Sequence, residues 1–113
     1  MVAEKLVLDW LQNHESVPVY MEIPEHPPAT FITIERLSGH VEGMVHSCSF
    51  AIQSWAESLY IACMLNERAK KAMDLLIESD SVSAVSLDSD YNFTDESTKR
   101  YRYQAIYDLV LFE

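Results

Sequence analysis

The sequence of 113 residues has little glycine, little cysteine and little positive charge. Its two cysteines, Cys48 and Cys63, are too few for a disulfide scaffold, and both lie in apolar stretches, so we expect reduced core thiols. No apolar run approaches the about 18 residues of a membrane span. The N-terminus has no basic segment before an apolar core, so we expect no signal peptide. With two glycines only, most turns must be made by Pro, Asn, Asp and Ser.

The shortage of basic residues also bears on partners. Eight Lys and Arg stand against eighteen Asp and Glu, which gives a net charge of −10. Such a surface repels nucleic acid, because binding there depends on phosphate neutralisation, and it is equally unsuited to an anionic membrane. We therefore expect neither stable nucleic-acid binding nor membrane binding. The charge suits a cytoplasmic protein or a partner of a basic protein surface.

The length and the 49% hydrophobic content predict one folded domain over residues 1–113. Apolar residues at helical spacing predict a helix over 3–14. An extended run over 17–23 contains Pro18, so we expect a late or edge strand there. Residues 31–37 and 44–53 are typical of strands, and the turn expected at 37–43 would pair them as a hairpin.

The second half begins with Ser54 and Glu57, spaced as a capping box, before a helical pattern that runs to about residue 78. A short strand at 82–87, an acidic loop at 88–98 and a long strand at 101–112 follow. The last strand is apolar on both faces in its second half, which indicates a central strand or a subunit contact. The order α-β-β-β-α-β-β predicts an α+β fold, with a mixed or mostly antiparallel sheet of four to five strands packed by two helices.

Sequence templates for catalysis and metal binding are largely missing. No glycine-rich phosphate loop and no Gly-x-Ser-x-Gly elbow occurs. His46 and Cys48 would need two more ligands to hold a metal. The segment from Asp88 begins like a calcium loop, but Phe93 and Lys99 stand where that loop needs glycine and glutamate. We therefore expect no enzyme activity, no cofactor and no metal.

A protein without such sites acts through its surfaces, and the charged residues suggest where. Arg36 is a lone cation in a predicted strand, so it is either a surface ion pair or an interface arginine. An acidic stretch at 79–98 is followed directly by a basic group. The candidate subunit or partner interface is Arg36, Asp88, Asp90, Asp95, Lys99, Arg100 and Arg102. The tyrosines at 101, 103 and 107 form either a binding platform or a face packed under a helix.

Four segments, in order, resemble a known family. They are Pro28–Arg36 followed by a glycine turn, Gln53-Ser-Trp55 before an Ala-rich helix, the loop Asp90–Asp95, and Tyr101–Leu111. Together they make residues 15–113 similar to the tail terminator proteins of long-tailed bacteriophages, also called minor capsid or tail completion proteins. The chain departs from that pattern in having one glycine, Gly39, in the turn and Thr94 in place of a proline.

The resemblance implies a structural role in the virion tail or neck, with assembly in the host cytoplasm. Such proteins form a ring, typically of six copies, on the end of the tail tube. The ring stops polymerisation of tube protein and offers a joining surface to the head completion or connector protein. The expected partners are thus further copies of the chain, the tube protein and the connector, and no catalysis is implied.

Two other classes stay open on the residues alone. A small acidic inhibitor of the antitoxin or immunity type would use the same negative charge to bind a basic partner protein. A small-molecule-binding α+β domain is the third possibility, and a ligand-induced rise in melting temperature would reveal it.

Overall fold

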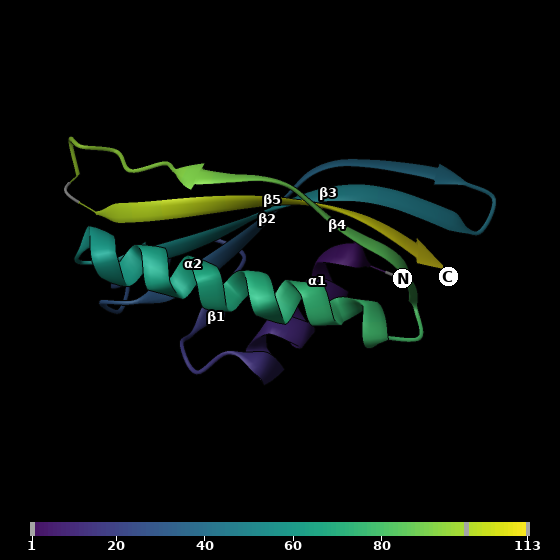
Figure 1. Ribbon diagram of the computed structural model, residues 1–113, viewed down its shortest axis with the longest axis horizontal. Coiled ribbons are helices and arrows are strands. Elements are labelled where there is room, and N and C mark those ends of the chain that lie inside the picture. Colours follow the sequence, from purple (N-terminus) through teal and green to yellow (C-terminus); the bar gives the residue numbers. More distant parts are fainter. Residues whose placement is uncertain (1, 99, 113) are drawn as a thin grey trace.

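Five strands form one sheet in the order β1-β2-β3-β5-β4, and two helices pack against it (Figure 1). The computed structural model describes residues 2–98 and 100–112. The elements are α1 (Ala3–His14), β1 (Val19–Tyr20), β2 (Phe31–Glu42), β3 (Val45–Ala56), α2 (Leu59–Asp74), the 3-10 helix η1 (Leu75–Glu78), β4 (Val82–Asn92) and β5 (Tyr101–Phe112). β1 runs parallel to β2 and every other pairing is antiparallel. The predicted α+β class and element order are confirmed.

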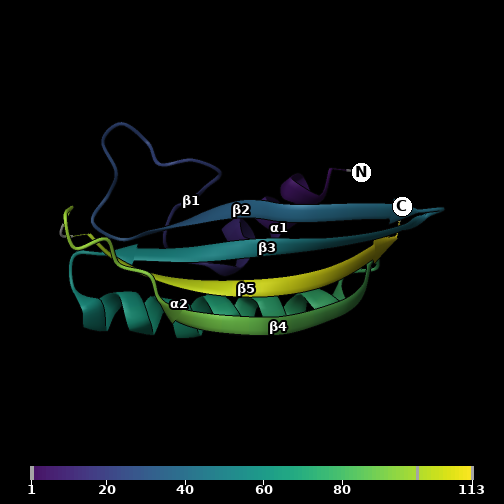
Figure 2. The ribbon, with the colours of Figure 1, turned by 90° about the horizontal axis from the view of Figure 1, so that it is seen from above.

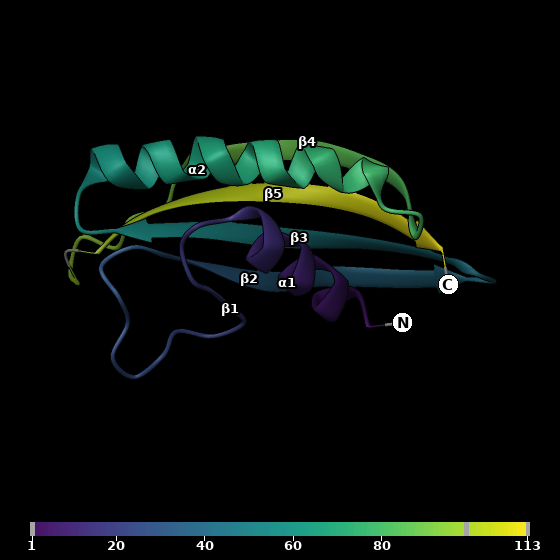
Figure 3. The same cartoon turned by 90° about the horizontal axis from the view of Figure 1, so that it is seen from below.

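Both helices lie on the same face of the sheet. Seen from below, α2 runs along β5 and β4, and α1 crosses β2 and β3 (Figure 3). No helix formed by residues 2–98 and 100–112 lies on the opposite face, which is seen from above in Figure 2. The molecule is 44 Å long and 25 by 23 Å across. None of the helices in the described ranges has the length and apolar character to cross a membrane.

The core lies between the sheet and the helices. α1 buries Ala3, Val7 and Leu11, the stripe that predicted it. The Trp10 indole of α1 donates a hydrogen bond of 2.8 Å to the Ala72 carbonyl oxygen, which ties the two helices together.

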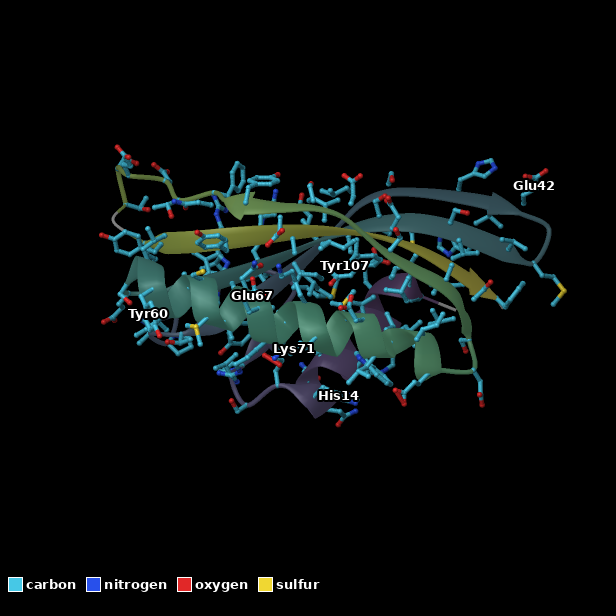
Figure 4. The ribbon with its side chains drawn as sticks, viewed as in Figure 1. His14, Glu42, Tyr60, Glu67, Lys71 and Tyr107 are labelled. Carbon is cyan, nitrogen blue, oxygen red and sulfur yellow. The ribbon has the colours of Figure 1, made fainter. Side chains whose placement is uncertain are left out.

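β5 is the central strand that its two apolar faces indicated, since it pairs with β3 on one side and β4 on the other. Its helix-facing side buries Ala105, Tyr107, Leu109 and Leu111. The Tyr107 hydroxyl donates to an Asp74 carboxylate oxygen at 2.9 Å, and burial raises the pKa of that phenol. Figure 4 shows Tyr107 between the sheet and α2. For Tyr107, packing under a helix is the interpretation that the structure shows, whereas Tyr101 and Tyr103 are half-buried.

The first half of the sheet differs from prediction in its strand ends. The late or edge strand predicted at 17–23 is confirmed in both respects, because it starts after Pro18 and lies at the edge of the sheet, but it is only Val19–Tyr20. The turn predicted at 37–43 was wrong, since β2 continues to Glu42 and β3 runs over 45–56 rather than 44–53. The hairpin turns at Gly43 and Met44, where Gly43 has φ +63°. A tight hairpin needs that left-handed backbone, and glycine adopts it without strain.

The predicted capping box was also wrong. Ser54 and Trp55 belong to β3, and α2 begins at Leu59. The cap is Ser58, whose hydroxyl oxygen accepts a hydrogen bond of 3.1 Å from the Ile61 amide. Pairing of β3 with β5 as far as Ala56 outweighs the local capping signal, so the helix begins later than predicted. At the other end, Leu75–Glu78 form the 3-10 helix rather than a last α-helical turn.

The acidic loop predicted at 88–98 begins too early. β4 extends through Asn92, so Asp88 and Asp90 lie on a strand rather than in a loop. Pairing of β4 with β5 holds this segment in the sheet, and two register shifts, after Val82 and after Leu87, accommodate the irregular sequence.

Replacing the true cap should cost stability and replacing the predicted one should not. Ser58→Ala removes the hydrogen bond to the Ile61 amide and is expected to lower the free energy of unfolding by about 1 kcal/mol. Ser54→Ala is the matched control. Its hydroxyl is buried without a hydrogen-bond partner among the described residues, so its removal should be neutral or stabilising. Urea denaturation measures both, and a larger loss for Ser54→Ala would contradict this assignment.

Candidate assembly surfaces

A row of polar side chains crosses the helix-free face of the sheet. The Thr33 hydroxyl of β2 donates to the Gln53 amide oxygen of β3 at 2.8 Å, and the Gln53 amide nitrogen donates to Gln104 of β5 at 2.7 Å. The Gln104 amide then donates to the Tyr91 hydroxyl of β4 at 2.6 Å. The row therefore joins four strands by side-chain hydrogen bonds on the face that has no helix to cover it.

These residues are buried although they lie on the open face. Thr33, Gln53 and Gln104 are only 4%, 9% and 7% exposed. Buried amides are costly unless both their donor and acceptor groups are paired, and the row pairs them. Its sequence signal is a polar residue at the same pairing level on three strands, which becomes visible only once the register is known.

Beside the polar row, arginine and aromatic rings stack across the sheet. The Arg102 guanidinium lies 4.5 Å from the centre of the Trp55 ring and 4.4 Å from that of Phe93. Trp55 in turn stacks on Phe31 with ring centres 5.6 Å apart and planes 5° from parallel. The Trp55 indole donates to the Thr33 hydroxyl at 2.9 Å, which links the stack to the polar row.

The guanidinium of Arg102 is held by cation–π contacts with two rings as well as by a hydrogen bond. Burial lowers the pKa of Arg102, yet an arginine stays protonated in proteins, so the charge is retained between the two rings. The Arg102 Nε also donates to the Phe93 carbonyl oxygen at 3.1 Å. Arg102, a predicted interface residue, therefore connects β5 to the segment that follows β4 within the same chain.

Arg100 and Asp95 lie at the same end of the open face. The Arg100 guanidinium is 5.8 Å from the centre of the Phe31 ring, and Asp95 and Arg100 form a single backbone bridge. The Asp95 carboxylate accepts hydrogen bonds from the Ser97 amide and hydroxyl, and the hydroxyl bond is the main cause of the lowered pKa of Asp95. Lys99, predicted with them, lies outside the described residues.

Asp90 faces the helices instead. Its carboxylate accepts hydrogen bonds from Lys70 at 2.8 Å and from the Asn66 amide at 2.9 Å, both on α2. The Lys70 hydrogen bond lowers the pKa of Asp90, and the same bond raises the pKa of Lys70. The cluster therefore fixes α2 on the edge strand β4.

Arg36 also pairs within the chain. It projects toward the helix side of β2, where its Nε donates to a Glu4 carboxylate oxygen of α1 at 3.2 Å. A Cβ atom at position 39 would overlap the Arg36 guanidinium, so Gly39 provides the space for this pair. Arg36 makes an ion pair, with a partner on α1 that the sequence did not indicate, and its role in an interface stays a prediction.

The predicted interface residues in the described ranges thus lie in four places. Arg36 and Asp90 fasten the helices to the sheet, while Asp95, Arg100 and Arg102 lie at one end of the open face. Asp88 is exposed on β4, where no described hydrogen bond holds it. The charged residues therefore do not form one continuous patch.

Two groups of exposed apolar side chains lie on the flanks of the sheet, and we call them the α2 patch and the loop patch. The α2 patch consists of Leu59, Tyr60, Ile61 and Met64 near the N-terminal end of α2, where Tyr60 is 74% exposed (Figure 4). The loop patch consists of Met21 and Ile23, on the segment between β1 and β2, and each is 52% exposed. Sequence reasoning missed both, because in a helical or extended pattern these residues are indistinguishable from core.

Hollows of the surface are shallow. One, of about 340 Å³, lies between the end of α1 and α2 and is lined in part by His14, Lys71 and Arg68. Glu15 lines it as well, and burial raises the pKa of this carboxyl group. Over residues 2–98 and 100–112, no group of three or more His, Cys, Asp or Glu side chains is placed to hold a metal ion.

Comparison with known proteins gives a match in fold. No family model matches the sequence, and no curated protein matches it significantly. Among solved structures, a chain of the "Virion of native gene transfer agent (GTA) particle" is similar over 98% of this chain and 87% of its own, with a TM-score of 0.50 and 11% sequence identity. At that identity, the likeness is one of fold.

The polar row should be a main stabiliser of the open face. Gln53→Ala leaves a buried acceptor on Gln104 and a buried donor on Thr33 unpaired, so the free energy of unfolding should fall by about 2 kcal/mol. Gln12→Ala is the matched control, because Gln12 is exposed and makes one long hydrogen bond of 3.3 Å. It should cost less than about 1 kcal/mol. Equal losses in urea denaturation would argue against the row.

The Asp90 cluster predicts a pH dependence. The pKa of Asp90 is held below its usual 3.8, so its contribution to stability is present above that pH and is lost as the pH falls through the lowered value. Asp90→Asn should lose about 1 kcal/mol at pH 7 and show a shallower fall in stability below about pH 4. Asp88→Asn removes a charge from the same strand without breaking a described ion pair and serves as control. Parallel stability curves for wild type and Asp90→Asn would contradict the prediction.

Proposed function

We propose that this chain is a structural virion assembly protein that forms a ring on the end of a phage tail tube. The observation that carries the proposal is the fold shared with a chain of a virion particle over 98% of the present chain. The ordered segments that resemble tail terminator proteins support it from the sequence side. In this role the ring stops polymerisation of tube protein and presents the surface that the head connector joins.

The surfaces described above suit a role in assembly. A ring of identical subunits needs two different, complementary contact regions on each copy. The α2 patch and the loop patch are two separate exposed apolar regions that could serve as these contacts. The proposed role requires no catalysis, no cofactor and no metal, and it places the protein in the virion tail or neck after assembly in the host cytoplasm.

The net charge of −10 favours one other candidate, a small acidic inhibitor of the antitoxin or immunity type. Such a protein would bind one basic partner as a monomer or dimer. The two candidates differ in what they do to a polymerising tube.

The test is tube assembly with the tail tube protein of the source genome. We expect added chain to stop tube growth, which negative-stain electron microscopy measures as shorter tubes with a ring at one end. Native mass spectrometry of the same mixture should show a closed ring, six copies being the number that the family resemblance implies. Bovine serum albumin, also acidic, is the control for a nonspecific charge effect. Tubes of unchanged length without terminal rings would overturn the proposal and favour the inhibitor.

A further inference from the structure

β4 ends the sheet with an unpaired edge. Among the described residues, β4 pairs with β5 alone. The Phe93 amide donates a hydrogen bond of 2.8 Å to the Arg102 carbonyl oxygen, so the backbone groups of Arg102 on β5 face the segment that contains β4. Because antiparallel strands alternate, Tyr91 and Ser89 then also face β5, whereas Asn92 and Asp90 direct their amides outward. The register shift after Leu87 places this residue opposite Tyr107, whose backbone groups face β3, so the amide of Leu87 points away from β5.

The other side of the sheet is open as well. β1 pairs only with Ile32 and Thr33 of β2, which leaves 34–42 of β2 without a described partner on that side. Edge strands that avoid association usually carry lysine or proline, and neither 82–92 nor 34–42 contains either residue. Both edges therefore have stretches without a described strand partner, which are interrupted by the register shifts after Leu87 on β4 and after Arg36 on β2.

The directions of the two edge strands fit each other. Successive antiparallel pairings of β2 with β3, β3 with β5, and β5 with β4 make β4 run opposite to β2. A second copy, placed beside the first with its helices on the same side, would bring its β2 antiparallel to β4. Nine residues of β2 are open, which at about 3.4 Å per residue is a contact line of roughly 30 Å.

The two apolar patches lie where this arrangement needs them. Seen from above, the loop between β1 and β2 flanks one side of the sheet, and the N-terminal end of α2 emerges beyond the other side, at the same end of the molecule (Figure 2). The view from below agrees (Figure 3). Copies set edge to edge therefore bring the α2 patch of one toward the loop patch of the next.

We propose that copies of this chain join head to tail through their sheet edges. β4 of one copy pairs with 34–42 of β2 in the next, and the α2 patch packs against the loop patch. The partner is a second copy of the chain, because one chain carries both halves of the contact. The two halves lie on opposite flanks, and the two edge strands run in opposite directions. That such contacts close into a ring rests on the proposed function. The contact between two copies is argued only from the two strand edges and the two patches.

A mixing experiment tests the contact. Variant A, Ile61→Lys with Met64→Lys, places charge in the α2 patch, and variant B, Met21→Lys with Ile23→Lys, places charge in the loop patch. The control is Met44→Lys with Leu75→Lys, which adds the same charge to two exposed apolar residues of the hairpin tip and η1. Circular dichroism first establishes that each variant is folded. Sedimentation velocity then measures association up to about 1 mM, a concentration that detects contacts of only about 4 kcal/mol.

We expect wild type and the control to associate, and A and B alone to be monomeric. An equimolar mixture of A and B should form one-to-one pairs and nothing larger, because A keeps its β2 flank intact and B keeps its β4 flank intact. Leu87→Pro, which removes one outward amide of β4, should weaken wild-type association at least about fivefold. It tests the strand edge separately from the patches.

The outcomes separate this inference from the proposed function. Rings formed equally well by A, B and Leu87→Pro would overturn the edge contact and leave the ring standing. Open chains that never close, but are blocked in A and B, would support the edge contact and contradict the ring. Wild type that stays monomeric at 1 mM, or A and B that fail to pair, would overturn the edge contact. The tube-length assay still decides the function independently.

Discussion

The rest of the structure depends on a sheet that is covered on one face only. Both helices pack under β2 to β5, so the apolar core lies on that side and the other face has no second layer (Figure 1). A five-stranded sheet still has to exclude water from the backbone of its central strands. The open face does so with its own side chains, through the row from Thr33 to Tyr91 and the stack around Arg102.

That constraint explains where positive charge is placed. Arg102 and Arg100 lie over aromatic rings of the open face, while Lys70 and Arg36 fasten the two helices on the covered face. Residues that the sequence suggested as a surface for partners are thus largely committed to holding the fold together. The exposed apolar side chains and the strand edges that have no described partner carry little sequence signal.

The sequence predicted the elements well and their ends poorly. Periodicity located α1 and β5 because each has a buried stripe that the core requires. It failed at Ser54 and at Leu37–Glu42, because strand pairing with a distant segment outweighs a local capping or turn signal. The candidate site was predictable only in part. Arg102 and Asp90 were singled out by charge, but their partners, Trp55 and Lys70, are set by strand register and helix packing.

The internal use of positive charge has a consequence for how the molecules meet. Six basic side chains contact carboxylates or rings of their own chain: Lys5, Arg36, Arg68, Lys70, Arg100 and Arg102. The outward field is then that of an acidic particle with a net charge of −10. Identical copies repel one another until mobile counterions shorten that field, to about 8 Å at physiological ionic strength. In the proposed assembly, a rise in ionic strength therefore weakens the repulsion between copies.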